Sequence, residues 1–353
     1  MTNKVPDQTN PWLHRFAVLT AFVTFLLIGL GGLVTSHGAG MSVPDWPNTY
    51  GYNMFAFPIS KWVGGIFYEH THRLLASAVG LLTTILAVWL WLADSRAWMK
   101  WLGVAAFFGV IAQGVLGGLR VTLHMDSLGV FHATIAQLFF ILICAIALFT
   151  GRFWRGLIAD KKAVVVTHGL RTLVLATTML IFVQLIIAAT MRHQHAGLAI
   201  SDFPLAYGKI WPATTPDAIA RYNAHRVSVT EEAPVTAFQI ELQMAHRVVA
   251  LAIFLLVAAC ALQAWRRLGG KDLLAKLAFF WLALIFVQIA LGAATIWTNK
   301  AADVATAHVM VGALSLVTGA LWCLIGFGRS TASVPDAQTF GVLGVQTAML
   351  VNK

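Results

Sequence analysis

Residues 39–51 read AGMSVPDWPNTYG, and residues 196–208 read AGLAISDFPLAYG. Both stretches fit one frame, AG-x4-D-x-P-x2-YG, at an offset of 157 residues. Each copy follows a long apolar stretch and opens a long polar connection. Self-similarity at a fixed offset is the signature of an internal repeat. The two copies therefore indicate that the chain consists of two related halves.

The repeat extends beyond these two stretches. Further matching pairs, at offsets of 174–176 residues, are His72-Arg73 with His246-Arg247, Gln113 with Gln288, and His132 with His308. The offset grows between the first match and the later ones, which is explained by a longer second connection. Each half accordingly carries the same polar residues in the same order.

The composition places these halves in a membrane. Of the 353 residues, 59% are hydrophobic and 11% are charged, whereas soluble domains carry about 25% charged residues. This composition excludes a soluble globular, disordered or fibrous protein. Eight apolar stretches are each long enough to span a bilayer: about 15–36, 67–92, 98–121, 127–150, 168–191, 241–264, 273–297 and 302–326. Because the runs are continuous rather than alternating, they favour helices over a β-barrel.

The expected fold is an all-α polytopic membrane protein, with eight transmembrane helices arranged as two tandem, parallel-repeat four-helix bundles. The expected divisions are a cytoplasmic N-terminus (1–14), an N-terminal bundle (15–150), a cytoplasmic linker (151–167), a C-terminal bundle (168–326) and a cytoplasmic tail (327–353). Cys144, Cys260 and Cys323 each stand alone in an apolar run, so no disulfide framework or zinc site is expected.

The charged residues predict the orientation. One set of connections and ends holds 15 of the 24 Lys and Arg residues and five of the 14 acids. The positive-inside rule places that side, with both termini, in the cytoplasm and the long loops 37–66 and 192–240 outside. The net charge of +10 therefore reflects orientation and not nucleic-acid binding. Without a cleavable signal pattern, the first span is expected to act as an uncleaved insertion signal in a bacterial plasma membrane.

Four histidines are the main candidates for chemistry: His72, His132, His246 and His308. They fall near the outer ends of the second, fourth, sixth and eighth spans, so each bundle presents two at matched depth, within roughly 10 Å of the outer boundary. Ionisable residues inside a membrane are costly and mark functional sites. Two facing imidazoles in a four-helix bundle are typical haem-iron ligands. A hydrogen bond to a neighbouring carbonyl is the alternative for any one of them.

Charged neighbours of these histidines are further candidates. Arg73 and Arg247 can pair with haem propionates or snorkel to the interface, and Arg120 and Arg192 are weaker candidates at outer span ends. Glu69, three residues before His72, can accept protons, whereas Gln243 occupies the matching position in the second half. The alternative for Glu69 is a cap at the start of its helix.

Other polar residues on the outer side receive simpler interpretations. Asp45 and Asp202, each followed two residues later by a proline, are expected to form turns. The roles of His37, His70, His193 and His195 stay open, and so do the electron acceptor, the oxygen source, the oligomeric state and the function of the C-terminal tail.

Taken together, the motifs resemble those of the haem A synthase family. The resemblance rests on GGLVTSHGAGMSVPDWPNTYG, EHTHR, LGGLRVT, FHATIAQ, QMAHR and TAHVMVGAL, which occur in the family's order over about residues 15–326. Some bacterial members carry a cysteine pair in the first outer loop. Residues 37–66 contain no cysteine, so this chain is similar to the branch without that pair.

The resemblance implies an oxidoreductase that oxidises the C8 methyl group of haem O to a formyl group, giving haem A for cytochrome oxidase. It implies that His72 and His132 hold the substrate haem, that Glu69 takes part in the reaction, and that His246 and His308 ligate a haem b cofactor. Candidate partners are haem O synthase, oxidase assembly factors, membrane lipid and a second copy of the chain, with no nucleic acid. The alternatives are a diheme membrane cytochrome that passes electrons from quinol, and a transporter built on parallel repeats.

Overall fold

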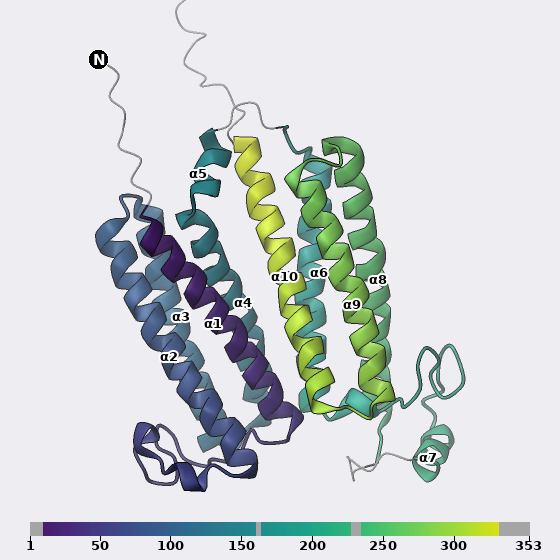
Figure 1. The fold of residues 1–353 in the computed structure, drawn as a ribbon. Coiled ribbons are helices and arrows are strands. Elements are labelled where there is room, and N and C mark those ends of the chain that lie inside the picture. Colours follow the sequence, from purple (N-terminus) through teal and green to yellow (C-terminus); the bar gives the residue numbers. More distant parts are fainter. Residues whose placement is uncertain (1–9, 160–163, 227–233, 332–353) are drawn as a thin grey trace, which may run out of the picture.

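The structure is a computed structural model that describes residues 10–159, 164–226 and 234–331. Eight long helices, each apolar enough to cross a membrane, run between its two ends (Figure 1). They are α1 (Pro11–Ser36), α2 (Gly64–Ala93), α3 (Ala97–Thr122), α4 (Asp126–Thr150), α6 (His168–His193), α8 (Ala237–Leu268), α9 (Leu273–Trp297) and α10 (Ala302–Thr331). Two short helices, α5 (Arg152–Ala159) and α7 (Pro216–Ala224), lie in connections.

These helices confirm the eight predicted spans and correct some of their ends. The helix α10 continues to Thr331, so the first residues of the predicted tail (327–353) are helical, and the rest of that tail lies outside the described residues. Most of the predicted N-terminal segment (1–14) also lies outside them. The predicted linker (151–167) contains the helix α5. Hydropathy detects apolar runs, whereas a helix continues past them wherever its backbone stays hydrogen-bonded.

Local sequence signals explain where several helices begin. The side chain of Asn10 accepts hydrogen bonds from the backbone N–H groups of Trp12 and Leu13, and Pro11 occupies the first helical position of α1. At the start of α8, Thr236 and Gln239 form a reciprocal capping box. Such caps satisfy N–H groups that have no partner inside the helix.

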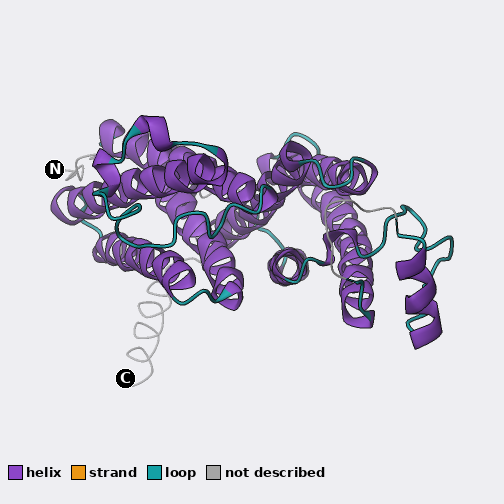
Figure 2. Ribbon diagram, turned by 90° about the horizontal axis from the view of Figure 1, so that it is seen from below, coloured by secondary structure: helices purple, strands orange, loops and turns teal. Residues whose placement is uncertain are grey.

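The long helices form two four-membered sets that lie side by side (Figures 1 and 2). In the first set α1 packs on α2 and α4, and α3 on α2 and α4. In the second set α6 packs on α8 and α10, and α9 on α8 and α10. Between the sets, α1 packs on α10 and α4 packs on α6. In the repeat, α1 corresponds to α6 and α4 corresponds to α10, so the contact of α1 with α10 is equivalent to the contact of α6 with α4. This equivalence is consistent with a parallel repeat about a pseudo-two-fold axis.

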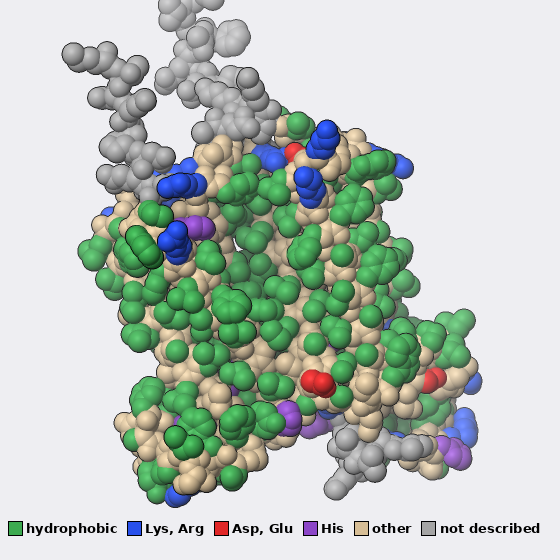
Figure 3. All heavy atoms as spheres, viewed as in Figure 1, with side chains coloured by type: hydrophobic (Ala, Val, Ile, Leu, Met, Phe, Trp, Pro, Cys, Tyr) green, Lys and Arg blue, Asp and Glu red, His purple; other side chains and the backbone are tan. Residues whose placement is uncertain are grey.

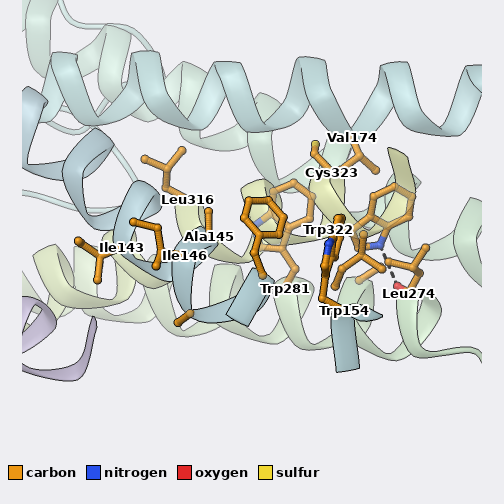
Figure 4. Packing of buried hydrophobic residues seen from close by; sticks show 14 of the residues in the cluster. Ile143, Ala145, Ile146, Trp154, Val174, Leu274, Trp281, Leu316, Trp322 and Cys323 are labelled. Atoms are coloured by element: carbon orange, nitrogen blue, oxygen red, sulfur yellow. Dashed lines mark hydrogen bonds between the residues drawn. The ribbon is translucent and has the colours of Figure 1, made fainter. Parts of the chain in front are cut away.

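The best-buried part of the core runs through both sets at their shared boundary. Within the hydrophobic windows of α4 and α10, 50% and 61% of the residues are buried, against 22–33% for the other spans. Trp281 and Trp322 are fully buried, and the indole N–H of Trp322 donates to the backbone oxygen of Leu274 at 2.9 Å (Figure 4). A buried indole needs such a partner because an unpaired N–H is costly in an apolar interior.

The character of the surface changes along the direction of the helix axes. Apolar side chains cover the faces between the two ends, and Lys and Arg side chains gather mainly at the end near the N-terminus (Figure 3). At that end, Arg96 pairs with Asp94 at 2.7 Å and Arg329 pairs with Asp272 at 2.8 Å. The apolar belt is the surface expected of a multi-pass membrane protein. The long loops after α1 and α6 lie at the opposite end (Figure 1).

Candidate functional site

The four candidate histidines lie in the halves of α2, α4, α8 and α10 that adjoin the long loops. His132 and His308 each come six residues after the first residue of their helix, about 9 Å along the axis. His72 and His246 come eight and nine residues in, about 12–14 Å. The latter two lie deeper within their helices than predicted because α2 and α8 begin three or four residues earlier than their apolar runs.

Three of the four imidazoles lie against a glycine of the preceding long helix. A Cβ atom on Gly31, Gly117 or Gly292 would come within 3.2–3.3 Å of the Cε1 atom of His72, His132 or His308, respectively. Any side chain at these positions would crowd the ring. In the second half, Ala188 occupies the position that corresponds to Gly31. The glycines therefore provide room for the rings inside the bundles.

Within each half the two histidines lie close together. The ring centroids of His246 and His308 are 6.4 Å apart, with the ring planes at 58°. His72 and His132 lie within range of direct electrostatic interaction. A metal ion between two imidazoles makes bonds of about 2 Å to one nitrogen of each ring, which places the ring centres roughly 6 Å apart. The spacing of His246 and His308 thus fits two axial ligands of one iron.

The hydrogen bonding of these rings also fits ligation. The Nδ1 atoms of His72, His246 and His308 are buried without a hydrogen-bond partner in the described structure. Buried polar atoms are nearly always paired, and an exception calls for an explanation. Either nitrogen of a neutral imidazole can ligate a metal. Among the described residues, no three His, Cys, Asp or Glu side chains come together as a larger metal-binding group.

Two glutamines beside the histidines had no role assigned from the sequence. The amide nitrogen of Gln288 lies 3.4 Å from Nε2 of His308. With the Gln113 amide oriented to satisfy its partners, its nitrogen donates to Nδ1 of His132 at 3.1 Å. The repeat relates these two glutamines, so their shared position was the available signal. Both contacts place a glutamine amide from the neighbouring helix beside an imidazole.

Glu69 is buried, with 4% of its surface exposed, and both of its carboxylate oxygens are engaged. Oε2 accepts a hydrogen bond from the backbone N–H of Val43 at 2.9 Å, and Oε1 pairs with Arg73 at 2.8 Å. In the second half, Oε1 of Gln243 accepts from the N–H of Ile200 at 2.6 Å. Both side chains thus hold one of the two long loops, after α1 or after α6. The catalytic role of Glu69 stays a prediction.

Arg73 and Arg247 bind the same two loops. Arg73 donates to the backbone oxygens of Val43, Asp45 and Asn48 at 2.6–3.1 Å. Arg247 donates to the backbone oxygens of Asp202 and Leu205, both at 2.8 Å. The propionate role of these arginines stays a prediction. The structure shows that their guanidinium groups fasten the loops to α2 and α8.

The turn-forming roles of Asp45 and Asp202 are confirmed. The carboxylate of Asp45 accepts from the backbone N–H groups of Tyr50 and Gly51 at 2.7 and 2.8 Å, and Asp202 accepts from the equivalent pair, Tyr207 and Gly208. Tyr50 and Gly51 both have positive φ, at 49° and 77°. Burial opposes ionisation of Asp45, but these hydrogen bonds outweigh it and lower the pKa of its carboxyl group.

Replacing Asp45 by alanine is expected to loosen the first outer loop by about 1–3 kcal/mol, because two backbone N–H groups lose a charged acceptor. The pKa of Asp45 is lower in the folded protein than its ordinary value of 3.8. The stabilisation of the loop by the Asp45 carboxylate is therefore complete above about pH 4. It is lost as the pH falls through the pKa that Asp45 has in the folded protein. Hydrogen exchange of residues 43–53 measures both effects. Asp202→Ala is the matched control, which should loosen only the second loop, and equal protection in Asp45→Ala and wild-type protein would contradict the expectation.

The histidines whose roles stayed open occupy varied surroundings near the loops. His70 is fully buried, with Nδ1 3.2 Å from the hydroxyl of Thr49 and its ring 4.7 Å from that of Trp62. His37 stacks on Tyr68 with the ring centroids 4.0 Å apart. The ring of His193 packs directly against Gly129 of α4, which leaves no room for a Cβ there. These contacts place His70 and His193 inside the end of the structure that carries the long loops.

The fold and the site define a class: a multi-pass α-helical membrane protein with a close pair of partly buried histidines in each half, near one end. The family described as Cytochrome oxidase assembly protein (COX15-CtaA) matches residues 14–320. The chain belongs to this family, and the matched region includes all four histidines.

Curated relatives agree with the family match. The protein from Lysinibacillus sphaericus named Heme A synthase is 27% identical over 323 residues, covering 90% of this chain and 95% of its own. The Heme A synthase of Geobacillus kaustophilus is 25% identical over 92% of this chain and 93% of its own. That of Shouchella clausii is 29% identical over 61% of this chain and 70% of its own. The resemblance to haem A synthases is thus confirmed at the level of the family.

Proposed function

We propose that this protein is a haem A synthase, which oxidises the C8 methyl group of haem O to a formyl group for the assembly of cytochrome oxidase. The observation that carries the proposal is the family match over residues 14–320, which spans both histidine pairs. The difference between Glu69 and Gln243 at equivalent positions supports a division of labour between the halves. Only the first half has a carboxylate that can accept a proton there.

In the proposed assignment, His72 and His132 hold the substrate haem in the first bundle. Converting a methyl to a formyl group takes two successive two-electron oxidations and the gain of one oxygen atom. The acceptor of the four electrons and the donor of the oxygen atom come from outside the side chains of this chain. Glu69 would accept protons released at the substrate carbon, one at a time, at its carboxylate. Arg73 holds that carboxylate in place through the 2.8 Å ion pair. Glu69 is 4% exposed, and burial strengthens its electrostatic interaction with Arg73.

His246 and His308 would hold a haem b in the second bundle. The 6.4 Å separation of their rings and their unpartnered nitrogens fit that assignment. Bound haem b supplies a one-electron acceptor and donor. Gln288, in contact with His308, would fix the orientation of that ligand.

The proposed orientation has both termini in the cytoplasm of a bacterium and the histidine pairs near the outer face. Its support is the gathering of Lys and Arg at the end of the molecule opposite the long loops (Figure 3). Cytoplasmic connections of membrane proteins carry an excess of these residues. In this orientation both histidine pairs lie in the outer half of the membrane.

Pigment analysis tests the function. Expression of this chain in a bacterium that lacks its own haem A synthase is expected to convert the accumulated haem O into haem A, as measured by chromatography of extracted haems. The matched control is the His72→Ala variant, which should leave haem O unconverted. If haem O persists with abundant, haem-loaded wild-type protein, the chain is instead the electron-carrying diheme cytochrome. A purified protein without colour would favour a transporter.

A further inference from the structure

Two arginines from different bundles lie within electrostatic range of each other, near the histidines. Arg120 lies in the last turn of α3, and Arg192 lies in the last turn of α6. Nη2 of Arg192 donates to the backbone oxygen of Gly32 at 2.6 Å and to the hydroxyl of Ser36 at 2.7 Å. Both acceptors belong to α1, so Arg192 reaches from the second bundle into the first. We call the region around Arg120 and Arg192 the seam.

The seam lies between the two histidine pairs. Arg120 is within electrostatic range of both His72 and His132. Arg192 is within the same range of His308. The two guanidinium groups also interact with each other, although they belong to different bundles. Each arginine is therefore associated with one histidine pair, and the two positive charges come together at the boundary.

Negative charge in the seam does not balance these arginines. Arg120 pairs with Asp126 at 3.3 Å, and the side chain of Asp126 is 60% exposed. Arg192 forms no ion pair with any residue that the structure describes. Partly buried charges are costly unless a counter-charge compensates them. The seam thus has an excess of positive charge in a place where an anion would be stabilising.

Hydrogen-bond donors in the seam are also unused. Nε of Arg120 is buried without a partner in the described structure. Both hydrogen bonds of Arg192 come from Nη2, which leaves Nε and Nη1 without an acceptor among the described residues. Arg73 and Arg247, by contrast, donate to two or more loop oxygens each. Among the described residues, Arg120 and Arg192 therefore each keep two guanidinium nitrogens without an acceptor, whereas Arg73 and Arg247 each keep only Nε.

Backbone geometry makes room for this arrangement. The guanidinium of Arg120 lies against Gly40, where a Cβ would come within 2.8 Å of both Nη atoms. Gly40 belongs to the repeated AG frame, and its equivalent in the second half is Gly197. The side chain of Lys300 passes within 3.9 Å of a Cβ at Gly197. In the first half a cation in the last turn of α3, and in the second half a cation three residues after α9, thus lies beside this glycine.

We propose that Arg120 and Arg192 form a carboxylate-binding site in the seam, which binds the propionate groups of tetrapyrroles held by the two histidine pairs. The inference rests on the proposed function. Guanidinium groups bind carboxylates through two parallel N–H···O bonds, and both arginines retain donors for them. Arg120 serves the histidine pair of the first bundle and Arg192 that of the second. Arg73 and Arg247 act instead as loop fasteners.

A pair of haem compounds tests the site by equilibrium binding rather than by activity. The full chain, purified from haem-starved cells, is titrated with haemin and with haemin dimethyl ester, whose propionates carry no charge. Wild-type protein is expected to bind the ester about 10–100-fold more weakly, because charge-assisted hydrogen bonds are lost. Arg192→Gln and Arg120→Gln should each weaken haemin binding about tenfold and leave ester binding nearly unchanged. Arg171→Gln, at the other end of α6, is the matched control. It should prefer haemin to its ester as strongly as wild-type protein does.

Two further outcomes keep the inference separate from folding and from the proposed function. Arg192→Lys replaces Arg192→Gln in the test if the glutamine variant is unstable. Lysine keeps the charge but not the planar guanidinium group, so this variant should bind haemin with an affinity between those of wild type and Arg192→Gln. Equal affinity of wild-type protein for haemin and its ester would overturn the carboxylate site alone. The carboxylate site would also be overturned if both glutamine variants preferred haemin to its ester as strongly as wild-type protein does. Failure of wild-type protein to bind haemin at all would overturn the proposed function as well.

Discussion

Replacing Glu69 by glutamine is expected to abolish haem A formation while the protein stays folded and keeps its bound haem. The second half of the molecule shows why the fold should tolerate the change. Gln243 occupies the equivalent position and accepts a backbone N–H from its own outer loop at 2.6 Å. Glutamine at position 69 can accept the N–H of Val43 in the same way. Arg73 also keeps its hydrogen bonds to three loop oxygens.

The loss should fall on the reaction because an amide cannot accept a proton as a carboxylate does. Removal of a general base costs about 10²–10⁴-fold in rate. The measurement is the ratio of haem A to haem O in cells that depend on this chain, with thermal stability and haem content of the purified variant determined in parallel. Gln243→Glu is the matched control, and it should continue to form haem A. Full activity of Glu69→Gln would show that Glu69 only holds the loop.

Replacing His246 by alanine is expected to remove the haem b of the second bundle. The rings of His246 and His308 are 6.4 Å apart, so one iron can be ligated by both, and either substitution leaves a single axial ligand. His72 and His132 lie in the other bundle and are unaffected. The absorption spectrum and the extracted pigment of the purified variant should show near-complete loss of haem b.

Two comparisons make the His246→Ala result specific. His168→Ala, at the exposed opposite end of α6, should retain haem b at the wild-type level. His72→Ala should retain haem b but lose haem A formation, because it removes a substrate ligand only. An unchanged haem b content in His246→Ala would show that the pairing of His246 with His308 is wrong.

Much of the architecture followed from local properties of the chain. The apolar runs predicted all eight spans because a helix in lipid must satisfy its own backbone, so that length and hydropathy suffice to find it. The repeated Asp45 and Asp202 frame predicted two turns because a carboxylate reaches backbone N–H groups a few residues away. The repeat also indicated that His72 belongs with His132 and His246 with His308.

The partners of the charged residues followed only from the folded chain. Nothing in EHTHR shows that Arg73 binds backbone oxygens up to 30 residues away, or that Glu69 accepts an N–H from Val43. The position of Arg192 against α1, 160 residues away in sequence, depends on how the two bundles pack.

The sequence by itself thus determined the class of protein, the spans, the repeat and the residues to examine. The tertiary structure decided which arginines fasten loops and which one reaches across the boundary between the bundles. The physical reason is that hydropathy and turn formation act over a few neighbouring residues, whereas a guanidinium group takes whichever acceptors helix packing brings within 3 Å.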